Sequence, residues 1–440
     1  MQLNIRQNKI STDTGTVKKV KQFIWVYFYL LIFEGALRKW VLPGLATPLL
    51  LVREPIVLWL IITAWRNKLV PFSPFLFISV SVGTIGIFTA ILFGHGNAWV
   101  ALYGARIWLM HYPLIFVIGS VFTRDDILKM ARVVMFISIP MAILIAAQFY
   151  SPQTAWINRG VGGDESGGGF SGALGFFRPP ATFSFTNGTS SFFGFLAPFV
   201  FWFWIYPKTI NRVVLIGATI ALMISIPLSI SRTLLFEVVV TFAFTVLALS
   251  SKPQFIGKIV GSVAVVLISL VILNNFDFFQ TATEAFTARF EGANEVEGGL
   301  NGVVGNRYFG HMIEAFTGAG ALPFWGYGFG SGTQVGFKIL GVTKALFDIE
   351  DEFTRIMGEL GFGLGLIAIF TRLGLCVQYF FQGFSRLKTG DLLPWLLLSF
   401  ALLVVPQGQW AQPTALGFGV LIAGLTMASL NTKKQVEQTS

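Results

Sequence analysis

The chain has 440 residues, of which 54% are hydrophobic and only 12% are charged, and its formal net charge is +10. Ordinary soluble domains carry about a quarter charged residues, so this composition excludes a water-soluble enzyme. Apolar runs of about 20 residues recur along the chain, which is the length of a membrane-crossing helix, whereas the strands of an outer-membrane barrel alternate in short segments. The sequence therefore predicts an all-α fold, a polytopic transmembrane helical bundle.

The apolar runs predict twelve membrane spans. In chain order these are residues 22–37, 47–65, 70–93, 99–122, 128–149, 189–206, 213–230, 233–250, 255–274, 356–381, 392–406 and 414–430. Lysine and arginine fall mainly in every second connection, which marks the cytoplasmic side, although Arg38 and Lys39 depart from this pattern. Both termini are therefore predicted to be cytoplasmic. Cytoplasmic loops, rather than a nucleic-acid partner, explain the positive charge.

Two long outward connections divide the chain. Residues 1–274 hold spans 1–9 and a glycine-rich outward loop at 150–188, residues 275–355 form a large extracytoplasmic loop, and residues 356–440 hold spans 10–12. Apolar residues recur at helical spacing between Gly302 and Phe316, so the large loop is predicted to be partly helical. Long loops in a compact protein are commonly functional or disordered, and we expect the chemistry to lie in these two.

Ionisable residues within apolar spans are costly and are candidates for function unless they pair with one another. Glu34, Arg38, Arg53 and Glu54, in the first two spans, are expected to form structural pairs across helices. His111 is expected to be a satisfied packing residue, and Glu359 to cap or pair locally.

No metal site and no cofactor are predicted. The chain has only three histidines, at positions 95, 111 and 311, so no ligand cluster is evident, and no paired acidic motif suggests a metal either. The single cysteine, Cys376, lies within an apolar run and excludes an intrachain disulfide.

Four arginines stand at outward helix ends or in outward loops, namely Arg178, Arg232, Arg289 and Arg307. A guanidinium fork binds phosphate bidentately and keeps its charge, so a cluster of these side chains would suit a pyrophosphate-linked lipid. In the alternative interpretation each arginine meets a carboxylate of the acidic loop or a lipid headgroup.

Glu350, Asp351 and Glu352 directly precede the tenth predicted span. A partly dehydrated carboxylate at such a place can act as a general base toward a sugar hydroxyl. The three residues can equally form a solvated run of charge.

Four motifs resemble those of one family. They are FRPPATFSFTNG, which ends at Gly188; ISRT, which contains Arg232; NRYFGHMIEAF followed by LPFWGYGFGSG; and EDEFTRIMGELGFG. In this order and placement they resemble the O-antigen polymerase and O-antigen ligase superfamily, which are inner-membrane glycosyltransferases that use polyprenyl-pyrophosphate-linked glycans. Glu350 and Asp351 stand where many members have histidine and asparagine, so that histidine's role is not carried over. EGALRKWVLP, from Glu34 to Pro43, looks like a signature of a divergent branch.

The resemblance implies a metal-independent polysaccharide polymerase in a bacterial inner membrane. Arg178, Arg232 and Arg307 would hold the pyrophosphate, with Arg289 and His311 as weaker candidates, and Glu352 or Asp351 would take the acceptor proton. The expected partners are the lipid-linked glycan, membrane lipids and polysaccharide assembly proteins. An O-antigen ligase, a transporter or flippase, and a non-catalytic subunit of an assembly complex stay open as alternatives.

Overall fold

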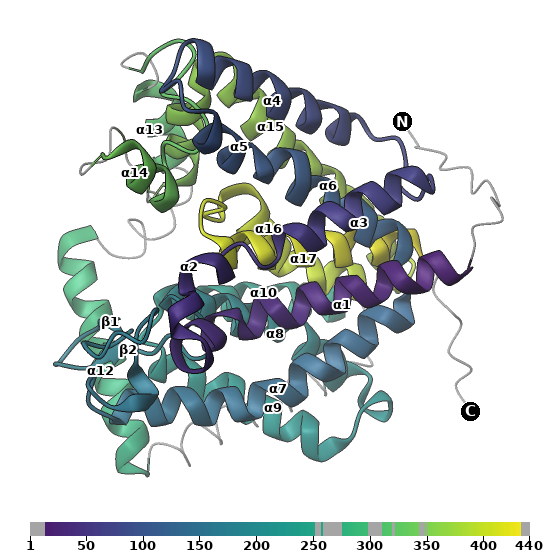
Figure 1. The fold of residues 1–440 in the computed structure, drawn as a ribbon. Helices are drawn as coiled ribbons and strands as arrows, with labels where there is room; N and C mark the ends of the chain where they lie inside the picture. Colours follow the sequence, from purple (N-terminus) through teal and green to yellow (C-terminus); the bar gives the residue numbers. More distant parts are fainter. Residues whose placement is uncertain are drawn as a thin grey trace.

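The computed structural model describes residues 14–250, 257, 275–297, 310–318, 322–342, 347, 349 and 351–432, and these form a bundle of helices (Figure 1). The longer helices are α1 (Thr14–Ala36), α3 (Glu54–Arg66), α4 (Pro74–Leu92), α5 (Ala98–Arg106), α6 (Tyr112–Val121), α7 (Arg124–Tyr150), α8 (Thr186–Ile205), α9 (Arg212–Leu228), α10 (Arg232–Ser250), α12 (Asp277–Glu297), α15 (Glu352–Lys388), α16 (Leu393–Gln407) and α17 (Pro413–Asn431). The shorter ones are α2 (Ala46–Leu49), α13 (His311–Thr317) and α14 (Gln334–Leu340). Within the described residues the strands are β1 (Phe170–Ser171) and β2 (Phe177–Arg178), which pair antiparallel.

Among the described residues, nine helical segments are long and apolar enough to cross a membrane, and α9 and α16 are shorter apolar helices. The chain is therefore a helical, multi-pass membrane protein. These eleven segments fall on eleven of the predicted spans, with α15 starting earlier and ending later than residues 356–381. The predicted span at 255–274 lies outside the described residues, apart from Gly257.

Small residues allow the central helices to pack closely. Gly119 of α6 lies against Met427 of α17, and Gly424 of α17 lies against Ile118, so a Cβ at either glycine would meet the neighbouring side chain. In a membrane, where lipid is as apolar as leucine, such close packing is a main source of helix association. The α6–α17 pair consequently lies at the core of the bundle.

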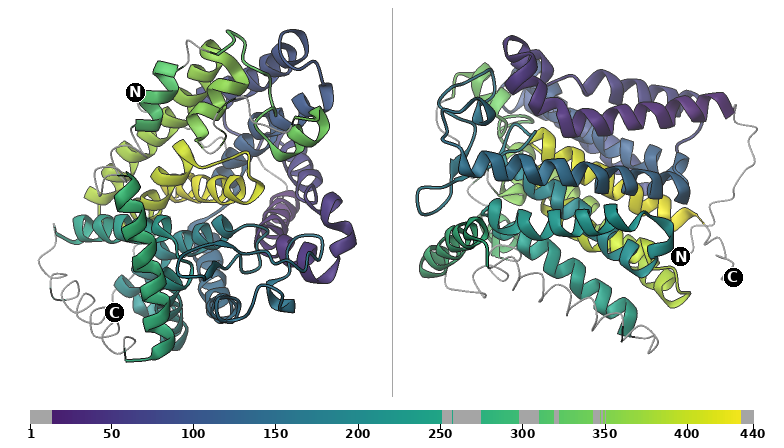
Figure 2. Two further views of the ribbon diagram at one scale, coloured as in Figure 1. Left: turned by 90° about the vertical axis from the view of Figure 1, so that its left-hand side faces the viewer. Right: turned by 90° about the horizontal axis from the view of Figure 1, so that it is seen from below.

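The two ends of the bundle differ in chemistry. At one end, here called the basic end, Lys21 near the start of α1 pairs with Asp126 at 2.5 Å, and Arg124 pairs with Asp391 at 2.8 Å. At the opposite end, here called the loop end, lie β1, β2, α12, α13 and α14 (Figures 1 and 2). The described part of the large loop is helical in part, as the sequence predicts.

Helix α15 is broken at Gly361, where φ is 74° and ψ is −179°. A Cβ at this position would lie 2.0 Å from the carbonyl oxygen of Phe324. Only glycine reaches this backbone conformation without strain. The break separates a short helical segment, which begins at Glu352, from the long remainder of α15, and it brings the preceding loop against the helix.

Candidate functional site

The best-defined polar site is a group of four ionisable side chains from α15, which we call the α15 charge cluster: Glu352, Arg355, Glu359 and Arg372. Each is 2% exposed or less. Helical spacing places Arg355 three residues after Glu352 and four before Glu359, so the first three lie on one face of the short segment. Arg372 reaches the same group from beyond the break.

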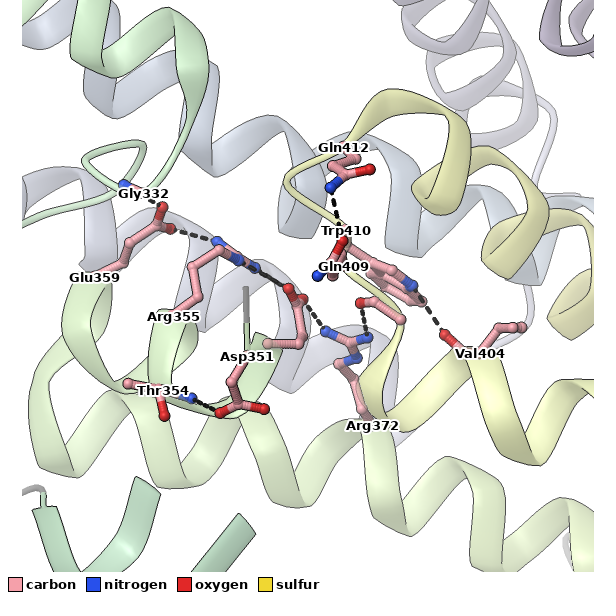
Figure 3. Close-up of polar contacts among 12 residues, drawn as sticks. Gly332, Asp351, Thr354, Arg355, Glu359, Arg372, Val404, Gln409, Trp410 and Gln412 are labelled. Atoms are coloured by element: carbon pink, nitrogen blue, oxygen red, sulfur yellow. Dashed lines mark hydrogen bonds and ion pairs between the residues drawn. The ribbon is translucent and has the colours of Figure 1, made fainter. Parts of the chain in front are cut away.

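Within this cluster both carboxylates are held by guanidinium groups (Figure 3). Arg355 donates to both oxygens of Glu352, each at 2.8 Å, and its third nitrogen donates to Glu359, also at 2.8 Å. Arg372 donates to Glu352 at 2.5 Å. Two positive and two negative charges are thus buried together, which avoids the cost of an unpaired ion in an apolar environment.

Arg372 also supports the backbone that joins α16 to α17. Helix α16 has 15 residues, which is about 22 Å of helix against about 30 Å of membrane hydrocarbon. Carbonyl groups near its end need donors, because no water reaches them in lipid. Arg372 donates to the carbonyl oxygens of Val405 at 2.7 Å and Gly408 at 3.1 Å, and it lies 3.9 Å from the ring centroid of Trp410.

The glycine-rich turn before α15 completes this site. The backbone N–H of Gly332 donates to the Glu359 carboxylate at 3.0 Å, and the N–H of Gly328 donates to the Glu359 carbonyl oxygen at 3.0 Å. Gly326 and Gly328 both have positive φ, at 73° and 99°. The LPFWGYGFGSG motif is therefore fastened directly to the start of α15.

A second group of buried charges links α1, α3 and α5, and we call it the α1–α3–α5 charge cluster. Glu34 accepts from Arg53 across α1 and α3 at 3.0 Å and from Arg38 at 3.4 Å. Arg53 also donates to the carbonyl oxygen of Pro413 at 2.8 Å, so the α16–α17 connection is held by arginines of both clusters. The expected pairing across the first two spans is confirmed for Glu34 and Arg53.

Glu54 completes the α1–α3–α5 charge cluster with partners from the fourth predicted span. It accepts from Arg106 at 3.0 Å and contacts His111 Nε2 at 3.0 Å. His111 is 1% exposed and lies 3.5 Å from the Tyr27 hydroxyl, so it is a satisfied packing residue as expected. A π-helical turn runs from Ile107 to His111, and π-turns inside α-helices are frequent at functional sites.

The acidic run that precedes the tenth predicted span is divided by the structure. Asp351 is the N-cap of α15 and accepts from the Thr354 N–H at 2.6 Å, while Glu352 belongs to the α15 charge cluster. Asp351 and Glu352 are both buried, so this part of the run is not a solvated surface. Glu350 lies outside the described residues.

The segments that carry two of the predicted phosphate-binding arginines, Arg178 and Arg232, pack together at the loop end. Gly172, which precedes β2, packs against the Ile230 side chain and the Arg178 stem, since a Cβ there would meet them at 2.6 and 3.5 Å. Ile230 lies two residues before Arg232, and Ser231 accepts from Ser190 at 2.7 Å. The β1–β2 hairpin and the turn between α9 and α10 are thus packed together.

The structure says less about the other predicted substrate-binding residues, Arg289, Arg307 and His311. Arg289 is a half-buried residue of α12, a helix that packs against α9. Arg307 and the His311 side chain lie outside the described residues, although His311 is the first residue of α13. Across the described part of the chain, no three histidine, cysteine, aspartate or glutamate side chains are grouped as a metal site requires.

Sequence reasoning missed Arg355 and Arg372 as site residues. Arg355 has carboxylates three residues before and four residues after it, which is the spacing of helical ion pairs, and Arg372 interrupts an apolar run. Both signals were present in the sequence, but only the fold shows that the two arginines share Glu352.

No protein-family model, curated protein or solved structure matches this chain.

Proposed function

We propose that this protein is a membrane glycosyltransferase that transfers a glycan from a polyprenyl-pyrophosphate donor to a hydroxyl group of a saccharide acceptor. The acceptor oxygen forms a bond to the anomeric carbon of the donor glycan, and the bond from that carbon to the pyrophosphate breaks. The acceptor proton passes to a carboxylate, and polyprenyl pyrophosphate leaves with the electron pair. This transfer reaction needs neither an oxidant nor a nucleotide sugar.

The observation that carries the proposal is the asymmetry of buried charge. With the exception of Asp391, the buried charged side chains of the described chain belong to the two charge clusters or lie within two turns of a helix end that faces the loops. A transporter path would need charged groups through both halves of the membrane. Buried charge gathered toward one end of the bundle suits a transfer reaction on a lipid-anchored substrate.

In this proposal the arginines at the loop end bind the donor. Arg178 and Arg232 come from the β1–β2 hairpin and the start of α10, with Arg307 and Arg289 from the large loop. Guanidinium groups that are already positioned stabilise charge that develops on a leaving pyrophosphate. The packing of Arg178 beside the α9–α10 turn supports this assignment.

The base of the reaction is assigned to Asp351 or Glu352. Three guanidinium hydrogen bonds occupy the Glu352 carboxylate, which is 1% exposed, so an acceptor sugar does not reach it in this conformation. Glu352 could act only if the α15 charge cluster opened. Asp351, 8% exposed at the start of α15, is the more accessible of the two.

We propose further that the eleven apolar helical segments and a span at 255–274 make twelve spans, that both termini are cytoplasmic, and that the membrane is a bacterial inner membrane. The placement of Lys18, Lys19 and Lys21 near the start of α1 supports this orientation, because basic residues favour the cytoplasmic side. The polymerase is preferred to the ligase, since the two differ only in the acceptor and the chain carries no recognisable feature for binding a lipid core.

The test is glycan profiling of cells deleted for this gene and complemented with variants. We expect single-repeat, lipid-linked intermediates to accumulate in the deletion strain and in cells carrying Arg232→Ala, with polymer reduced about a hundredfold, as for loss of one transition-state donor. Arg307→Ala should behave in the same way. Membrane abundance of each variant should stay near the wild-type level.

The matched control is Arg212→Ala, which removes an exposed arginine from the opposite end of the same α9–α10 hairpin and should restore wild-type polymer. Unchanged long polymer in the deletion strain would overturn the polymerase. If that polymer stayed on its lipid carrier, the result would favour an O-antigen ligase. If it did not, the result would favour a transporter or a subunit of an assembly complex.

A further inference from the structure

Helix α10 carries a buried carboxyl group that belongs to neither charge cluster. Glu237 is 4% exposed, and its Oε2 atom has no hydrogen-bond partner in the described part of the chain. The carboxyl lies directly on the backbone of Gly194 in α8, where a Cβ would come within 2.1 Å of Oε2, and beside the ring of Phe400 in α16. The side chain is therefore enclosed by three helices.

Within the described residues, no cation faces this carboxyl from the helices that pack on α10. Helices α8 and α16 contain no lysine, arginine or histidine, and the arginine of α9, Arg212, stands at the far end of that helix. Within α10 the nearest ionisable residue is Arg232, five residues earlier, which is about 7.5 Å along the helix. Within the described residues Glu237 forms no ion pair.

Hydroxyl groups continue from Glu237 toward the basic end. Thr241, one turn on, bonds the Glu237 carbonyl oxygen at 2.8 Å and lies 2.9 Å from the Ser399 hydroxyl of α16. Thr245 follows one turn later and donates to the Thr241 carbonyl oxygen at 2.8 Å. These groups form a buried polar stripe on an otherwise apolar helix.

An ionised carboxylate at such a place would be a desolvated charge without a counter-ion, which costs far more than a neutral acid. We propose that Glu237 is a proton-binding site inside the membrane: its carboxyl carries a proton in the folded bundle. This site is independent of the glycan transfer proposed above. Packing of α8, α10 and α16 at this point therefore depends on protonation of Glu237, because loss of the proton would leave an ionised carboxylate against Gly194 and Phe400.

The test uses dicyclohexylcarbodiimide, an apolar reagent that modifies protonated carboxyl groups in apolar surroundings. The purified wild-type protein in lipid nanodiscs is treated between pH 6 and pH 9 and analysed by peptide mass mapping. We expect one predominant adduct on Glu237, with labelling that decreases as pH rises and is unchanged by sodium ions. The ion-paired Glu34, Glu352 and Glu359 are internal controls and should stay unlabelled.

Glu237→Gln keeps the shape of a neutral acid, so it should abolish the adduct while thermal unfolding at pH 6 stays at the wild-type value. The proposal is overturned if Glu237 stays unlabelled while the fold is intact, or if Glu237→Gln unfolds markedly earlier than wild type at pH 6. Labelling that sodium suppresses at constant pH would also overturn it, because the ligand would then be a metal cation rather than a proton.

Discussion

Arg372 shows how one side chain can support both an ion pair and a chain connection. Its guanidinium group is completely buried and bonds Glu352, Val405 and Gly408 at once. Since the guanidinium stays charged at any relevant pH, it satisfies the carboxylate and the two backbone carbonyl groups together. Removing it would leave all three groups without this donor in an apolar interior.

We therefore predict that Arg372→Met destabilises the protein by about 3–5 kcal/mol, the usual cost of breaking a buried ion pair from one side. The measurement is thermal unfolding of the purified protein in detergent. Arg132→Met is the control, since Arg132 also donates to a carbonyl oxygen, that of Thr209 at 3.2 Å, but is exposed. Equal losses in the two variants would contradict a special role for the α15 charge cluster.

At the scale of the elements, the broken helix α15 decides where the candidate site lies. The sequence GELGFG suggests close packing of small residues, whereas the structure shows that one of these glycines ends a helical segment. The break leaves Glu352, Arg355 and Glu359 on a short segment that is bonded to the 326–332 turn. Non-helical backbone at membrane depth is tolerated only where protein or a cavity surrounds it, and here the turn surrounds it.

We predict that Gly361→Ala destabilises the fold by at least about 3 kcal/mol, because alanine is strained at this φ and its Cβ would clash with the Phe324 carbonyl oxygen. The yield of monodisperse protein and its unfolding temperature are the measurements. Gly363→Ala is a matched control two residues on, where a Cβ meets no atom within 4 Å, and it should change stability by no more than about 1 kcal/mol. Equal losses of stability in Gly361→Ala and Gly363→Ala would contradict a helix break at Gly361.

At the scale of the whole molecule, the two ends of the bundle carry different chemistry. The ion pairs of the basic end, Lys21 with Asp126 and Arg124 with Asp391, join helices α1 and α7 and the α15–α16 connection. The loop end holds the long connections and most buried charge. In the orientation that we propose the basic end faces the cytoplasm, in line with the preference of lysine and arginine for that side.

This orientation predicts the accessibility of introduced cysteines. Glu165→Cys, in the exposed outward loop, should react with a membrane-impermeant maleimide in intact cells, while Thr389→Cys, in the exposed turn after α15, should react only after permeabilisation. The native Cys376 is buried and should give little background, so the unmodified protein is the control. The reverse pattern of labelling would invert the orientation.

The sequence by itself determined that this is a helical membrane protein, because the period and length of apolar runs reflect a local property, the match between one helix and the membrane thickness. It also indicated structural pairing among Glu34, Arg38, Arg53 and Glu54, since opposite charges in neighbouring apolar spans have few other partners, and the structure shows Glu34 paired with Arg53. Only the tertiary structure decided that Arg372 shares Glu352 with Arg355, and that the Glu237 Oε2 atom has no hydrogen-bond partner among the described residues. The first depends on the break in α15 and the second on which helices lie beside α10, and residues far apart in the sequence carry no local signal of either contact.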